Sequence, residues 1–437
     1  MPNATSYTRE PSRDDTRATR RCVLVAVGAE AGLSALKAGR MMAVRESRPF
    51  VVLSIVEPPP LYAFDPEQVM AVPWTIDEQL AARRQSVQER LAKLGAPPFG
   101  LDEPEIIVRY GEPERLVAAT ARERRAHVVV MGTGPHTLAN RVLATETTLG
   151  TIRHSPCPVL AVAEDCSEAP RVVVVALDFS PASLHAARQA LPLLSDGAVV
   201  HLLHAWHRHI PLMPTTQTDP LDDAYEHALP ARFDRARAAL GRERSLVFIT
   251  TAREGDAATV VLDAAHKLNA DLVVAGAQGH SFVERLLVGS VSTALLRGAP
   301  CSVLIAPEPS PAERTRLERH MTGTSTLRAP EEWAEELEAF SKRNRSRRTA
   351  LEIDDVSLGS QVQESGYALL GATYDHRDRH VSLMFADPAH PAAHLTRTLG
   401  RVRSVAVSHG ERGEDGALCI ESEQGSTLLT FLDQPAG

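Results

Sequence analysis

The 437-residue chain lacks the cysteine patterns that define small secreted proteins and zinc ribbons. It has five cysteines, an odd number, and none stands in a CxxC arrangement, so neither a disulfide framework nor a zinc site of that kind is indicated. They are scattered along the chain at Cys22, Cys157, Cys166, Cys301 and Cys419. This usage favours a reducing cytoplasm.

Long apolar runs and an excess of basic charge are also missing. No uncharged apolar stretch reaches the roughly 20 residues of a bilayer span, and residues 1–20 are polar, so we expect no membrane segment and a disordered tail. The net charge of −8 argues against nucleic acid or anionic membranes as partners. Aromatic residues make up only 4%, but 43% of the chain is hydrophobic, which predicts a soluble globular protein of two or three domains.

An internal repeat is present. The segment MGTGPHTLANRVL matches AGAQGHSFVERLL without a gap at a shift of 144 residues, from Gly132 to Gly276. Further along, identical residues at the same shift include Arg153 with Arg297, Cys157 with Cys301 and Val159 with Val303. The repeat predicts two equivalent domains, at residues 21–165 and 171–307.

Each copy alternates β-branched runs with helical patterns, which indicates β-α-β units and a parallel sheet. Five runs per copy are apolar on both alternating faces, as expected for strands covered by helices on both sides. The predicted fold class is α/β, with two tandem doubly wound, five-stranded, Rossmann-like domains.

The composition changes after Ala306. Three prolines and a charged stretch predict a linker at residues 308–328. A small α+β domain with an antiparallel sheet is expected at residues 329–437, opening with a helix that has Trp333, Leu337 and Phe340 on one face. The strand candidates are Thr349 to Asp354, Tyr367 to Tyr374, His380 to Phe385, Val402 to Ser408, Leu418 to Glu421 and Thr427 to Leu432.

The segment from Asp271 to Pro307 carries the strongest functional signal. Gly276 and Gly279 follow a buried strand, and nine further residues separate Gly279 from the pair Gly289 and Ser290. Glycines let backbone N–H groups approach a phosphate, and a helix N-terminus adds unpaired donors and a favourable dipole. Turn formation and helix packing are the alternative explanation for a GxxG pair alone.

The spacing G, two residues, G, nine residues, G, S resembles the nucleotide-binding branch of the universal stress protein family, and family-like segments cover both copies. The resemblance implies ATP as ligand and is compatible with Mg²⁺ beside it. It implies that Asp178 contacts the ribose, that Ala205 meets adenine, and that Val291 and Ser292 adjoin the phosphate cradle. An N-cap role with Ser180 is an equally compatible reading of Asp178. The C-terminal domain faintly resembles a small uncharacterised bacterial family, from which no chemistry follows.

The first copy departs from this pattern. Gly28 stands in the place of Asp178, Pro135 replaces the second glycine and removes a donor, and Thr145 and Glu146 replace Gly289 and Ser290. A carboxylate at Glu146 would repel phosphate. We therefore predict one nucleotide per chain, with the first copy as a pseudo-dimer partner. A different anion nest at Gly132 and Gly134 is the alternative.

Other candidates carry less weight. His201, His204, His207 and His209 lie close together, but strand alternation sends the first two to opposite faces, so no metal is assigned there. The same holds for His376 with His380 and His390 with His394, which have no supporting ligand pattern. Basic residues 341–348 are read as a solvated helix end, although they could contact an anionic partner. Cys157 and Cys301 are expected to serve packing.

The function expected from the sequence is a non-enzymatic, ATP-binding regulator of stress responses, without catalytic residues. A slow ATPase and a nucleotide-free scaffold are the alternatives. The first would need more than the carboxylates of Asp178 and Glu284 and the charge of Arg285. A homodimer, and an unknown protein partner at the C-terminal domain, are also compatible with the sequence.

Overall fold

The computed structural model describes most of the chain. The described residues are 21–28, 32–58, 75–96, 101–133, 138–164, 168–206, 220–241, 246–277, 289–322, 324–327, 330–355, 359–387, 394–409, 415–422 and 425–431. Among them, no helix has both the length and the apolar character needed to cross a membrane.

A ten-stranded sheet runs through both repeat copies, in the order β3-β2-β1-β4-β5-β10-β9-β6-β7-β8. Its strands are β1 Val23–Val27, β2 Phe50–Val56, β3 Glu105–Tyr110, β4 Val128–Gly132, β5 Val159–Val162, β6 Val172–Ala176, β7 Val199–Trp206, β8 Val247–Glu254, β9 Leu272–Gly276 and β10 Ser302–Ala306. Within each half the five strands are parallel. The prediction of two five-stranded, doubly wound halves is confirmed.

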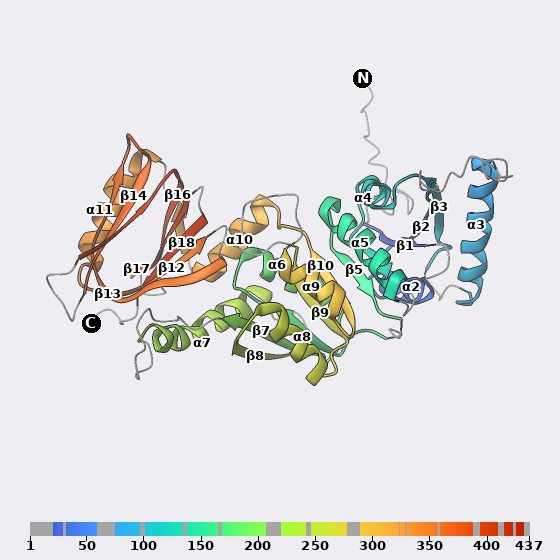
Figure 1. Ribbon diagram of the computed structural model, residues 1–437, viewed down its shortest axis with the longest axis horizontal. Helices are drawn as coiled ribbons and strands as arrows, with labels where there is room; N and C mark the ends of the chain where they lie inside the picture. The colour runs from blue at the N-terminus through green and yellow to red at the C-terminus, as the bar shows by residue number, and fades with distance from the viewer. Residues whose placement is uncertain are drawn as a thin grey trace, which may run out of the picture.

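Helices follow the strands and cover the sheet (Figure 1). In the first half they are α2 Leu33–Arg45, α3 Ile76–Ala92, α4 Pro113–Glu123 and α5 Leu138–His154. In the second half they are α6 Pro181–Ala190, α7 Pro220–Leu240, α8 Ala257–Lys267 and α9 Ser290–Gly298. Their starts follow local chemistry, since Thr75 forms a capping box with Glu78 and Ser180 caps α6.

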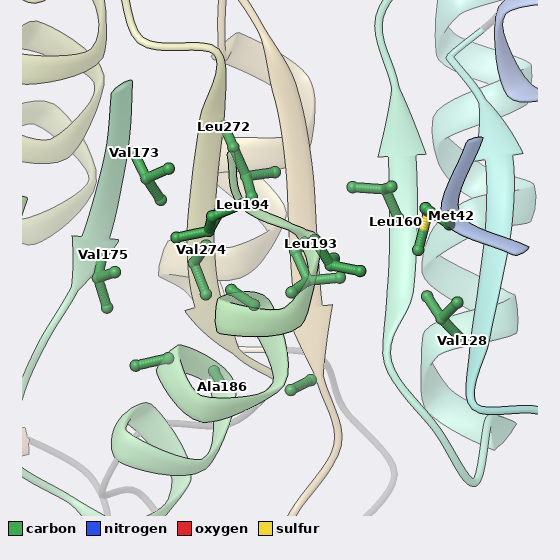
Figure 2. Close-up of a cluster of buried hydrophobic side chains, with 14 of the residues drawn as sticks. Met42, Val128, Leu160, Val173, Val175, Ala186, Leu193, Leu194, Leu272 and Val274 are labelled. Carbon is green, nitrogen blue, oxygen red and sulfur yellow. The ribbon is translucent and has the colours of Figure 1, made fainter. Parts of the chain in front are cut away.

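The two halves join through their last strands. β5 and β10 pair antiparallel, with Leu160 opposite Leu304, which is its own repeat twin. Each half supplies residues to one continuous core, in which Leu160 and Met42 come from the first half and Leu193 and Leu272 from the second (Figure 2). The tandem repeat is therefore a pseudo-dimer with a shared sheet and a shared core.

The third domain is built on an eight-stranded antiparallel sheet, in the order β11-β16-β17-β18-β12-β13-β14-β15. Its strands are β11 Thr324–Leu327, β12 Arg348–Asp355, β13 Gly359–Asp375, β14 His380–Ala386, β15 His394–Leu399, β16 Val402–His409, β17 Asp415–Ser422 and β18 Gly425–Phe431. The helix α11 Trp333–Asn344 buries Trp333, Leu337 and Phe340, as its spacing predicted. The two strands that the sequence did not reveal, β11 and β15, are the sheet's edges, where polar residues weaken the apolar signal.

A helix occupies the region between the second and third domains. α10 Pro311–Thr322 lies where the composition suggested a linker, and it packs against α6 and α7. Ser310 accepts a hydrogen bond from the backbone of Glu313, at 3.3 Å, so Ser310 and Pro311 start the helix. Leu317 is fully buried in the core of the α/β part. The proline-rich composition marked the start of this helix.

A buried carboxylate holds α11 to the sheet. Asp415 accepts from Arg343 Nε at 2.8 Å and from Asn344 Nδ2 at 2.6 Å, and its carbonyl accepts from Arg347 at 3.0 Å. Arg345 and Arg348 are exposed. The basic stretch is thus partly internal structure: two of its arginines bind Asp415, and only part of it is a solvated helix end.

We predict that Asp415→Ala destabilises the third domain by about 2 kcal/mol, because hydrogen bonds to a charged group are lost and their donors are left without an acceptor. Native-state hydrogen exchange of α11 and β17 peptides measures this locally, which matters because several domains need not unfold together. The matched control is Glu338→Ala, which removes an exposed ion pair with Lys342 and should change nothing measurable. Equal exchange in both variants would contradict the assignment.

Candidate functional site

The end of β9 and the start of α9 form the centre of the candidate site. Gly276 is the last residue of β9, and Gly289 is the residue before the first turn of α9. The Gly289 N–H donates to the carbonyl of Ala277 at 2.8 Å, and the Ser292 hydroxyl donates to the carbonyl of Gly276 at 2.5 Å. These two bonds fix the helix N-terminus against the carboxyl end of the strand. Gly279 lies outside the described residues.

The first turn of α9 is suited to an anion. Ser290 begins the helix and is exposed, whereas Ser292 is buried and its hydroxyl is already used. The first N–H groups of a helix have no partner within it, and the helix dipole favours negative charge there. A phosphate could therefore accept from backbone N–H groups and from the Ser290 hydroxyl.

The strand order brings the other predicted residues to the same edge. β9, β6 and β7 are neighbouring parallel strands, so their carboxyl ends lie side by side. β9 ends at Gly276, β6 ends shortly before Asp178, and β7 ends next to Ala205. The chain reverses its direction of travel across the sheet between β6 and β9, and open α/β sheets bind ligands at such a point. Ala205 is the second-last residue of β7 and is half-buried.

Asp178 follows β6 and shapes the turn into α6. Its Oδ1 accepts from the Ser180 N–H at 3.0 Å, while Ser180 is the actual N-cap, accepting from Ser183 at 3.1 Å. Ser180 is therefore the N-cap residue of α6. Asp178, two residues upstream, stabilises the turn by accepting from the Ser180 N–H.

Phe179 between them has a φ of 64°, which is costly for a bulky residue. Its buried ring packs against His204 and Phe233, at centroid distances of 4.6 and 5.1 Å. His204 Nδ1 lies 2.8 Å from the Leu177 carbonyl. The turn that presents Asp178 is thus held by the packing beneath it, a role that the sequence did not reveal for either aromatic residue or for His204.

Asp178 interacts electrostatically with a cluster of charged residues. Burial raises the pKa of Glu308, with Arg314 opposing the shift and the charge of Asp178 adding to it. Arg314 pairs with Glu308, and His185 Nδ1 lies 3.1 Å from Glu313. Glu313 and Arg314 belong to α10, so the helix before the third domain interacts electrostatically with the turn that presents Asp178. Nothing in the sequence pattern signalled this cluster.

The corresponding part of the first domain is different. α5 begins at Leu138, eight residues before Glu146, so Thr145 and Glu146 stand inside a helix and offer no unpaired N–H groups. Glu146 Oε1 accepts from Arg297 Nη2 of the second domain at 2.7 Å. The carbonyl of Gly28 accepts from Arg90 at 2.9 Å. Gly134 and Pro135 lie outside the described residues.

Burial affects some of the described histidines and cysteines of the α/β domains. His201 is half-buried, and burial lowers its pKa. His207, His209 and His390 lie outside the described residues. Burial raises the pKa of Cys22 and of Cys157 to about 11, so neither is a ready thiolate.

A surface turn in the third domain collects acidic and imidazole groups. Asp375, Asp378 and His380 have ligand atoms within 4.8 Å of one another, an arrangement that the spacing of His376 and His380 did not indicate. Asp375 accepts from the Arg377 N–H at 2.8 Å, so this group already has a role in closing the turn.

The comparisons with known proteins agree with the fold. A model of the universal stress protein family matches residues 19–163 and 170–307, and one of a family of unknown function (DUF5335) matches 327–437. These matches confirm both resemblances seen in the sequence. A Staphylococcus aureus (strain USA300) universal stress protein is 54% identical over 41 residues, 9% of this chain and 25% of that relative. The match thus spans a quarter of the length of the curated relatives.

Solved structures of low identity are also similar. A universal stress protein from Archaeoglobus fulgidus DSM 4304 is 15% identical with a TM-score of 0.44, over 66% of this chain and 97% of that chain. A universal stress protein in complex with cAMP is 21% identical with a TM-score of 0.23, over 32% of this chain and 95% of that chain.

We predict different effects for the two serines of the first α9 turn. Ser292→Ala removes the bond to the Gly276 carbonyl and should destabilise this junction by about 1 kcal/mol. Ser290→Ala, the matched control, alters an exposed hydroxyl and should leave the junction as stable as before. Hydrogen exchange of peptides spanning residues 290–298 reports the difference. Loss of protection in both variants, or in neither, would contradict it.

Proposed function

We propose that this chain, which belongs to the universal stress protein family, is a regulator that binds one adenine nucleotide, ATP, in its second domain. The observation that carries the proposal is the difference between the halves. α9 starts at Ser290 beside the end of β9, whereas α5 continues through the equivalent position at Glu146. One half offers a helix N-terminus to a phosphate, and the other offers a carboxylate.

The proposed contacts follow the sheet edge. The phosphates accept from the first turn of α9, with Gly276, Gly279 and Gly289 leaving room for them and Val291 and Ser292 completing the turn. The ribose binds at Asp178, and adenine lies by Ala205. Mg²⁺, where present, would be shared with the phosphates. A nucleotide-bound structure of the family with cAMP supports an adenine ligand for this fold.

Binding would act on the rest of the chain through charge and packing. Asp178 lies close enough to Glu308 to affect its pKa, and Arg314 of α10 pairs with Glu308. α10 in turn is followed by β11, the first strand of the third domain. A nucleotide at Asp178 therefore changes the surroundings of the helix that leads to this domain, where a protein partner would bind. This is a linkage, and it requires no catalytic residue.

Calorimetric titration with ATP, with and without Mg²⁺, should give about one site per chain. Ser290→Glu places a carboxylate at the phosphate, and Gly289→Val fills the cradle with a side chain; each should weaken binding at least about tenfold. The φ of −57° and ψ of 154° at Gly289 are accessible to valine, so the expected loss is steric.

The matched control is Glu146→Gln, the repeat twin of Ser290, which should leave both affinity and stoichiometry unchanged. Equal ATP binding by wild type and both site variants would overturn the site assignment. The absence of ATP binding and of a thermal shift in the wild type would favour the scaffold. Single-turnover hydrolysis that is lost in Asp178→Ala would favour the slow ATPase.

A further inference from the structure

The junction between the halves has the geometry of a twofold axis. Leu160 pairs with Leu304, Val159 with Ile305, and Ala161 with Val303. At the repeat shift of 144 residues, Leu160 and Leu304 are twins of each other, and the two flanking pairs exchange places. The axis therefore passes between Leu160 and Leu304, and a contact made on one side of it has a counterpart on the other.

One contact across this axis is an ion pair. Glu146 of α5 and Arg297 of α9 are joined at 2.7 Å, and both side chains are about half exposed. The twin of Glu146 is Ser290, and the twin of Arg297 is Arg153. The axis therefore relates the Glu146–Arg297 pair to Arg153 of the first domain and Ser290 of the second. α5 and α9, the two helices that the axis relates, contact each other.

On this geometry, and resting on the proposed nucleotide site, we propose that Arg153 of the first domain binds the terminal phosphates of the nucleotide held by the second domain. The Glu146 carboxylate shows what such a position accepts, because it is an anion held there by an arginine from the opposite half. The equivalent position across the axis, Ser290, carries no charged side chain. A guanidinium binds phosphate oxygens bidentately, and Arg153 is exposed in the last turn of α5.

The order of the strands indicates which phosphates would lie closest to Arg153. Adenine and ribose are assigned to the ends of β7 and β6, and the cradle to β9, which is one strand nearer the axis. A nucleotide laid along this edge brings its terminal phosphates closest to the first domain. Arg153 therefore distinguishes ATP from AMP, and it makes the site depend on both halves of the chain.

The test compares ATP and AMP binding by calorimetry in the full-length protein. Arg153→Gln should weaken ATP binding about tenfold, since a charged hydrogen bond is lost, and should leave AMP binding within about twofold. Arg153→Lys keeps the charge and should recover part of the loss. The matched control is Arg297→Gln, the repeat twin, which pairs with Glu146 and should leave both affinities unchanged.

The outcomes separate this inference from the proposed site. Wild-type protein that binds no ATP would overturn the nucleotide site itself. Wild-type protein that binds ATP, with Arg153→Gln binding ATP as tightly, would overturn the role of Arg153 and leave the site in place. Equal weakening by Arg153→Gln and Arg297→Gln would also contradict it, because a general loss of positive charge would then explain the effect. Hydrogen exchange of β5 and β10 peptides checks that the junction is intact.

Discussion

The antiparallel pairing of β5 with β10 is the interaction on which the rest of the α/β structure depends. It converts two five-stranded sheets into one sheet of ten, and it covers two strand edges that would otherwise be open to other chains. The Ser302 hydroxyl accepts from the Ala163 N–H at 3.2 Å just beyond the paired residues, and Arg45 of α2 donates to the Leu193 and Leu194 carbonyls of the other half. The relative position of the two halves, and of any site near the axis, follows from this register.

The two halves differ in where a helix starts relative to the equivalent strand end. A phosphate needs N–H groups that a helix has not already used, and these exist only in a first turn. α9 places its first turn at the end of β9, and the buried Ser292 hydroxyl keeps it there. α5 has its interior at the equivalent position, so backbone hydrogen bonding as well as the charge on Glu146 disfavours a phosphate there.

The sequence predicted the parts of this structure that depend on local pattern and repetition. The ten strands, the equivalence of the halves and the α11 face of Trp333, Leu337 and Phe340 all have a clear apolar period. It did not predict the edge strands β11 and β15, the helix α10, or the bond between Glu146 and Arg297. For the site, it named Gly276, Gly289 and Ser290, which the fold brings to one edge, but it missed Phe179 and Glu308. The Glu146–Arg297 bond and the contacts of Phe179 and Glu308 join segments that are apart in the sequence. No short sequence pattern encodes such tertiary neighbours.

A covalent tandem permits an asymmetry that a homodimer cannot have. In an isologous dimer, a glutamate at one copy of the interface appears at the other copy as well, so both sites would carry the same carboxylate and the same pairing. Here the two positions differ, with Glu146 on one side of the axis and Ser290 on the other. Arg297 pairs with Glu146, whereas the repeat twins of these two residues are Arg153 and the uncharged Ser290. Duplication within one chain thus allows two equivalent positions to carry different residues while both halves continue to support one sheet and one core.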